Sequence, residues 1–134
     1  MKAVYLTKRF HFESAHRMLN TNFSEAENDE YFGKCQNVHG HNYVLEVTVA
    51  GIIDPEKGYF VNLHDLLSDI QNKVIDKIDH QYLNDILPGC KNKPVTIEVV
   101  SRWIWNNLNK ELPQYNFYKL RLWETPDNSV EIYK

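Results

Sequence analysis

Two histidines separated by one residue mark the stretch Cys35-Gln36-Asn37-Val38-His39-Gly40-His41-Asn42-Tyr43, which runs into an alternating apolar segment. Residues two apart on a β-strand point to the same face, so His39 and His41 can aim their imidazoles at one point. Two converging imidazoles suit a Zn²⁺ ion, which binds nitrogen at roughly 2.0–2.1 Å. The stretch therefore predicts a strand that begins with part of a metal site.

The strand continues beyond the two histidines and has a partner near the N-terminus. The odd positions after His41 stay apolar, namely Tyr43, Leu45, Val47 and Val49. Residues 3–13 alternate in the same way, with Lys8 as the only interruption of an apolar even-numbered face. If this strand geometry persists, His16 emerges on the apolar face at the strand's end, where it could supply a third zinc ligand.

The rest of the chain predicts two helices and two more strands. Residues 19–34 are polar and acidic and indicate a surface loop with a single helical turn. Helices are expected after Asn62, as far as Asp79-His80, and after Thr96, as far as Pro113. Strands are expected over 118–124 and around 130–132. We expect an α+β fold in one domain, residues 1–134, with a four-stranded antiparallel sheet, two helices on one face and the order ββααββ.

Composition narrows the classes of partner. The chain has 134 residues, 43% of them hydrophobic, and a formal net charge of −3. A negative chain lacks the basic face that a phosphate backbone requires, so nucleic acid is not expected, although an anionic small molecule is compatible. The sequence has no apolar run of membrane-spanning length and no signal-peptide core, which favours a cytoplasmic location and free thiols.

Cys35 lies just before the two histidines and has three possible roles. A free cysteine is most often a small buried hydrophobe. The neighbouring Lys34 and a nearby cation would favour its thiolate, the form that abstracts protons. The same thiolate could instead be a fourth zinc ligand, which would make the site closed and structural.

Two further positions carry carboxylates that deserve a functional interpretation. The pair Asp79-His80 can be a simple helix terminus, or a carboxylate that orients a proton-relaying imidazole. Glu124 continues the apolar face of the strand over 118–124, where an unpaired carboxylate is costly. It is either solvated at the strand's end or binds a ligand with adjacent N–H donors through two parallel hydrogen bonds.

These residues together resemble a known family. The segments are Phe12-Glu13-Ser14-Ala15-His16-Arg17, Gly33-Lys34-Cys35, His39-Gly40-His41-Asn42-Tyr43, Leu63 to Leu67, Asp79-His80 and Trp123-Glu124-Thr125. In this order they resemble the 6-pyruvoyltetrahydropterin synthase / 6-carboxytetrahydropterin synthase family, over essentially the whole chain.

The resemblance implies a fold, an assembly and a set of roles. It implies the tunnelling fold (T-fold), in which subunits join their sheets into a barrel, and a homohexamer built from two trimers. It implies Zn²⁺ bound by His16, His39 and His41. It also implies a catalytic Cys35, a relay formed by Asp79 and His80, and a pterin ring anchored by Glu124, with Thr96 and Glu98 lining the pterin pocket.

The implied substrate is 7,8-dihydroneopterin triphosphate, and two products are possible. Three residues separate Cys35 from His39, which resembles the 6-carboxy branch, a lyase that releases triphosphate and acetaldehyde on the queuosine route. The segment 79–86 also resembles that branch. The acidic loop before Gly33 and the helix start at Asn62 resemble the 6-pyruvoyl branch of the tetrahydrobiopterin route. We expect the 6-carboxy product, with the 6-pyruvoyl product as the alternative.

Two hypotheses from other classes accompany this interpretation. In the first, Cys35 and the three histidines close a structural zinc site in a non-catalytic domain. In the second, a zinc-activated water hydrolyses esters or amides, with no special requirement for Glu124.

Overall fold

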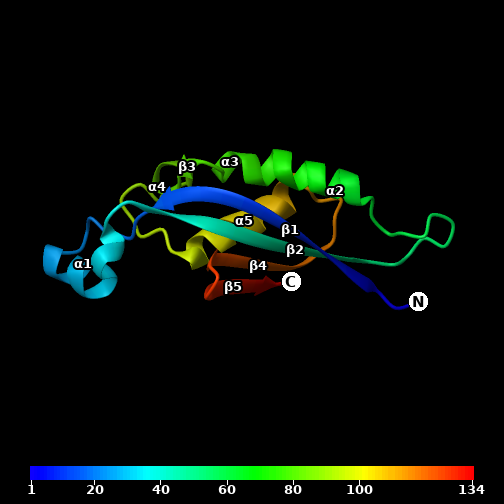
Figure 1. Cartoon of the computed structure of the whole chain (residues 1–134), viewed down its shortest axis with the longest axis horizontal. Coiled ribbons are helices and arrows are strands. Elements are labelled where there is room, and N and C mark those ends of the chain that lie inside the picture. Colours follow the sequence, from blue (N-terminus) through cyan, green and yellow to red (C-terminus); the bar gives the residue numbers. More distant parts are fainter.

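Two long strands dominate the structure, a computed structural model that describes all 134 residues. Strand β1 (Val4–His16) and strand β2 (His39–Gly51) pair antiparallel along their whole length, from Val4 opposite Gly51 to His16 opposite His39. Their buried faces carry the apolar parity that the sequence predicts. The register therefore brings the end of β1 beside the start of β2 (Figure 1).

The sheet has five strands, in the order β3-β1-β2-β4-β5. Strand β4 (Phe117–Thr125) pairs antiparallel with β2, and β5 (Asn128–Tyr133) pairs antiparallel with β4. Strand β3 (Gln81–Tyr82) runs parallel to β1 beside Ser14 and Ala15. The predicted four-stranded, wholly antiparallel sheet is therefore wrong. A two-residue strand is too short to show alternation, and only its contact with β1 makes it a strand.

The acidic segment contains more helix than predicted. Helix α1 (Glu25–Phe32) begins at a capping box, in which the Ser24 hydroxyl accepts from the Glu27 N–H and the Glu27 carboxylate accepts from the Ser24 N–H. A 3₁₀ turn, η1 (Gly33–Gln36), follows and contains Cys35. The helix has no apolar stripe, so its only sequence signal is the capping pair.

The two expected helices form, and the first is interrupted. Helix α2 (Leu63–Ile70), capped by the Asn62 side chain, continues through a π-helical turn, η2 (Gln71–Ile75), into α3 (Asp76–Ile78). A short helix, α4 (Leu83–Ile86), follows β3. Helix α5 (Ile97–Glu111) is capped by Thr96, whose hydroxyl accepts from the Val99 N–H.

One apolar cluster joins the buried face of the sheet to these helices. It contains 21 buried residues, among them Phe12, Leu45 and Leu122 from the sheet and Ile70 and Ile104 from the helices. The histidine ends of β1 and β2 extend beyond this cluster, toward the α1 end of the molecule (Figure 1). No helix has both the length and the apolar composition needed to cross a membrane.

Candidate metal centre and proton-relay pair

The predicted histidines come together at one edge of the core. His16 ends β1, and His39 and His41 begin β2, with His16 opposite His39 in the register. The ring centroid of His16 lies 4.6 Å from that of His39 and 5.0 Å from that of His41. One nitrogen of each ring lies within 4.8 Å of the other two. A small movement of these side chains would bring all three to the roughly 2.0–2.1 Å from one ion that zinc requires.

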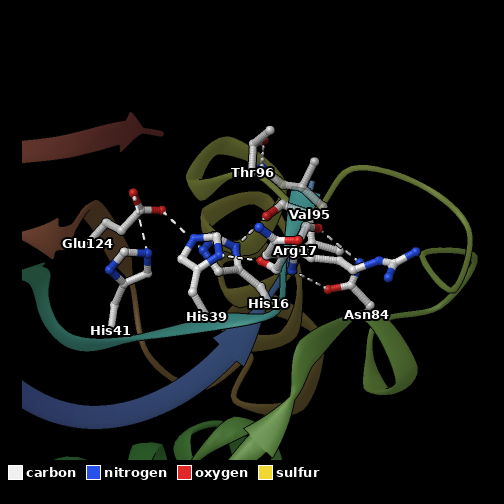
Figure 2. A network of polar contacts seen from close by, with 10 residues as sticks. His16, Arg17, His39, His41, Asn84, Val95, Thr96 and Glu124 are labelled. Carbon is white, nitrogen blue, oxygen red and sulfur yellow. Dashed lines mark hydrogen bonds and ion pairs between the residues drawn. The ribbon is translucent and has the colours of Figure 1, made fainter. Parts of the chain in front are cut away.

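Backbone carbonyls fix which nitrogen is free on two of these rings. His16 Nδ1 lies 2.6 Å from the Val95 carbonyl oxygen, and His39 Nδ1 lies 2.7 Å from that of Asn37 (Figure 2). A carbonyl oxygen only accepts, so each Nδ1 must carry the proton. Each Nε2 is then unprotonated and has a free lone pair. Hydrogen bonds to the other ring nitrogen select this same tautomer in metal-binding histidines.

Burial favours the neutral form of His16 and His41. It lowers the pKa of His16 to about 4, although the hydrogen bond to Val95 acts in the opposite direction. Burial also lowers the pKa of His41, against the attraction of the Glu124 carboxylate. Glu124 Oε2 is 3.9 Å from His16 Nε2 and Glu124 Oε1 is 3.8 Å from His41 Nε2. At neutral pH a carboxylate thus faces two uncharged nitrogens, so these contacts are not ion pairs.

This donor set fits a divalent cation. The buried Nε2 atoms of His16 and His41 have no hydrogen-bond partner in the protein, and buried polar atoms without partners are rare. A cation held by the three imidazoles would satisfy both nitrogens. Three histidine ligands with an adjacent open position are typical of a catalytic zinc site.

Asp79 and His80 form a second cluster, at the outer edge of β1. His80 Nδ1 lies 2.8 Å from Asp79 Oδ1, and the Glu13 N–H donates to the same oxygen at 3.0 Å. Burial would raise the pKa of Asp79, but the hydrogen bonds from Glu13 and His80 outweigh it and lower that pKa. His80 has a positive φ of 59°, rare for a residue with a side chain, and its N–H donates to the Glu13 carbonyl.

The relay pair, through His80, and one histidine of the cluster border the same hollow. His80 and His41 both line a hollow of about 500 Å³, together with Glu13 and Asn42. Neither His16 nor Glu124 lines this hollow. The side chain of His80 is 72% exposed, whereas that of His16 is fully buried. The hollow therefore joins the relay pair to the cluster at His41.

The remaining predicted residues lie around the histidines without joining them. Cys35, half-buried in η1, is not among the side chains whose ligand atoms gather with the three histidines. Thr96 follows Val95, the hydrogen-bond partner of His16, and lies above that ring in Figure 2. Glu98 lies exposed in the first turn of α5.

Sequence reasoning missed two residues at these clusters. Glu13 contacts the relay pair through its backbone and through a carboxylate oxygen 3.5 Å from His80 Nε2. Tyr43 lies fully buried beside the histidines, and burial, with Glu124 nearby, raises the pKa of its hydroxyl. Strand alternation already placed Tyr43 on the buried face. A hydroxyl at a buried position beside two histidines was the signal that could have marked it as a site residue.

Comparison with known proteins identifies the family of this chain. A model of the family described as 6-pyruvoyl tetrahydropterin synthase matches residues 5–134. The chain belongs to the 6-pyruvoyl tetrahydropterin synthase family. A 6-pyruvoyl tetrahydrobiopterin synthase of Dictyostelium discoideum is 39% identical over 129 residues, covering 96% of this chain and 95% of that protein.

Two further relatives represent the two branches of the family. The solved 6-pyruvoyl tetrahydropterin synthase of Caenorhabditis elegans has a TM-score of 0.90 and 33% identity, covering 100% of this chain and 97% of that one. A 6-carboxy-5,6,7,8-tetrahydropterin synthase of Haemophilus influenzae is 29% identical over 146 residues, covering 94% of this chain and 96% of that protein.

Family membership confirms part of the sequence interpretation. The chain is an enzyme, a lyase of the tetrahydropterin synthase type, with the α+β fold of that family. The expected 6-carboxy product is less well supported than its alternative, because identity is higher to the 6-pyruvoyl relative than to the 6-carboxy relative. The short spacing between Cys35 and His39 and these identities therefore favour different branches.

Proposed function

We propose that this chain is a zinc-dependent 6-pyruvoyl tetrahydropterin synthase that acts on 7,8-dihydroneopterin triphosphate. The observation that carries the proposal is the cluster of His16, His39 and His41, in which the Nε2 atoms of His16 and His41 lie without partners beside the Glu124 carboxylate. The names of the relatives at 39% and 33% identity support the 6-pyruvoyl product.

His16, His39 and His41 would hold the zinc ion. When bound, zinc supplies Lewis-acid polarisation of a substrate oxygen. The carbonyls of Val95 and Asn37 keep His16 and His39 in the binding tautomer. Cys35 lies outside the gathered ligand atoms, which favours an open site over the closed structural site considered above.

The other polar residues would bind the substrate and move its protons. The reaction expels triphosphate and redistributes protons along the side chain, so it needs proton carriers and no oxidant. His80, with its Nδ1 proton directed at Asp79, presents Nε2 as the relay atom. Cys35 would accept a proton as thiolate, and Glu124 would accept from adjacent N–H groups of the pterin ring.

A homo-oligomer would complete the site. Both outer edges of the sheet lack a partner strand along most of β1 and along β5, and exposed edges favour pairing with another copy. We propose that these edges join subunits into a homohexamer, a dimer of trimers. The exposed relay pair would then serve the zinc centre of a neighbouring subunit.

The 6-carboxy product is the second candidate, favoured by the three residues between Cys35 and His39. One experiment separates the two. The zinc-loaded protein is incubated with 7,8-dihydroneopterin triphosphate, and triphosphate, pterins and acetaldehyde are quantified. We expect triphosphate and 6-pyruvoyl-tetrahydropterin without acetaldehyde. Acetaldehyde in equal amount to triphosphate would assign the 6-carboxy reaction, and no turnover by folded, zinc-replete protein would refute both.

A further inference from the structure

Unsatisfied buried polar atoms are confined to one place in this molecule. Three buried side-chain atoms have no hydrogen-bond partner: His16 Nε2, His41 Nε2 and the hydroxyl oxygen of Tyr43. A zinc ion accounts for the two nitrogens, because lone pairs of neutral imidazoles are its usual ligands. It leaves the Tyr43 hydroxyl, which has a proton to donate, without an acceptor.

Packing holds the Tyr43 ring where it is. The side chain is fully buried and stacks on Phe12, with ring centroids 4.8 Å apart and planes 6° from parallel. Its other neighbours meet it edge-on, His41 at 5.7 Å and His16 at 6.4 Å between centroids. The hydroxyl therefore cannot swing out to solvent to find a partner.

A phenylalanine would make the same stacking contacts without burying an unpaired hydroxyl. Burying an O–H group without an acceptor opposes folding, so the Tyr43 hydroxyl does not stabilise the unbound protein. Its presence is explained if it makes a hydrogen bond in a complex. The hydroxyl shares its surroundings with the histidine nitrogens and with the Glu124 carboxylate. A ligand bound by Glu124 would come within reach of the same hydroxyl.

We propose that the Tyr43 hydroxyl is a further substrate-contacting group, which donates a hydrogen bond to an acceptor atom of the bound reduced pterin. This inference rests on the proposed function, because it takes the ligand at Glu124 to be a pterin. Tyr43 supplies the donor that Glu124, an acceptor, cannot provide. The unbound protein carries the unsatisfied hydroxyl, and the bound complex satisfies it.

Tyr43→Phe tests the inference because it removes the hydroxyl and keeps the ring. In the zinc-loaded protein without ligand, we expect a Tm equal to or above that of the wild type and an unchanged zinc content. Affinity for biopterin, measured by calorimetry, should fall roughly 3- to 10-fold, the loss expected for one hydrogen bond. The value of kcat/KM with 7,8-dihydroneopterin triphosphate should fall by a similar factor.

Tyr115→Phe is the matched control, because its hydroxyl is satisfied. That hydroxyl donates to Asp69 Oδ2 at 2.5 Å. Tyr115 lines a pocket with Ala50 and Gly51, at the opposite end of β2 from His39. Removing it leaves the carboxylate without its partner, so the Tm should fall by roughly 4 °C, in contrast to Tyr43→Phe. Its affinity for biopterin and its kcat/KM should match the wild type.

Several outcomes would overturn the inference. A Tyr43→Phe protein with wild-type affinity and kcat/KM would show that the hydroxyl does not contact substrate. A fall in Tm like that of Tyr115→Phe would mean that the hydroxyl is already satisfied in the free protein, and lost zinc would make it a metal ligand. Failure of the wild type itself to turn over substrate would refute the proposed function instead.

Discussion

At the scale of single residues, the three-histidine cluster depends both on features that are local in the sequence and on a contact that is not. His39 and His41 were predictable because strand alternation alone brings them to one face. His16 was predictable because it continues the even-numbered apolar face of β1. The acceptor that fixes the tautomer of His16 was not predictable. It is the carbonyl of Val95, 79 residues away, and a backbone oxygen carries no sequence signal.

Cys35→Ala separates the catalytic role of the thiol from a ligand role. Because the thiol lies outside the three-histidine cluster, the variant should bind one zinc per chain as the wild type does, by metal analysis. Its kcat should fall at least about 100-fold, the usual contribution of a positioned proton-transfer group. Cys90→Ala, which alters the other free cysteine, should leave kcat unchanged. Loss of zinc with Cys35→Ala would contradict the proposed role.

The buried histidine predicts an acid-sensitive metal-free protein. The pKa of His16 is about 4 when folded and 6.5 as a model value, so the unfolded chain binds the extra proton first as pH falls. Stability should be full above pH 6.5 and should decrease toward pH 4, by up to about 1.4 kcal/mol per pH unit. Urea unfolding of zinc-free protein at several pH values measures this slope.

Two comparisons make the acid test specific. His64→Gln removes an exposed histidine on α2 and should keep the same slope. Added zinc should shift the loss of stability to lower pH, because protons and metal compete for the same nitrogens. A flat profile between pH 6.5 and 4 in the metal-free wild type would contradict a depressed pKa for His16.

At the scale of elements, the long strands and helices were predictable and the short connecting pieces were not. Alternation over β1 and β2 spans enough residues to define a period, as does the apolar stripe of α5. Strand β3 and helix α4 have two and four residues, too few for any period. They form because the chain between α3 and α5 is hydrogen-bonded to the end of β1 and to the residue after it.

Asn84 is the main polar link in that connection, and its loss should be costly. The side chain accepts from the Arg17 N–H at 2.9 Å and donates to the carbonyls of Arg17, at 3.0 Å, and Lys93, at 3.3 Å (Figure 2). Asn84→Ala leaves these backbone groups unsatisfied in a buried place, so the free energy of unfolding should fall by about 2–4 kcal/mol, measured in urea.

The exposed Asn72→Ala provides the control, because the Asn72 side chain has a single long contact with Ser68. It should change the free energy of unfolding by less than about 0.5 kcal/mol. Asn84→Ala should also weaken zinc binding, since Val95 follows Lys93 closely and positions His16. Equal stability of the two variants would mean that the link is not structural.

At the scale of the whole molecule, the proposed oligomer, in which the relay pair of one chain serves the zinc centre of a neighbour, predicts complementation between subunits. Cys35→Ala and His80→Ala proteins should each be inactive. Mixed oligomers, prepared by co-expression, should regain roughly a quarter of wild-type activity, because that share of sites would combine an intact Cys35 with an intact neighbouring His80. Steady-state kinetics on the purified mixture measures it.

The alternative assembly predicts a different number. If each chain used its own relay pair, every site in the mixture would carry one defect, and no activity would return. Light scattering on the same samples reports the mass of the oligomer, which should correspond to a hexamer. If the mixed oligomer has the mass of a hexamer but regains no activity, the relay pair and the thiol of each site belong to the same subunit.

The π-helical turn Gln71–Ile75 has a consequence for comparing sequences within the family. A π turn holds one residue more than an α turn, and here it lets both Val74 and Ile75 face the core. A chain one residue shorter at this point could close the turn as an α-helix and still deliver Asp79 to the edge of β1. A change of one residue within β1 or β2 would turn every later side chain to the opposite face. We therefore expect single-residue gaps in alignments of this family to fall in the helix rather than in β1 or β2. The number of residues across the helix should then differ between members whose relay pairs correspond.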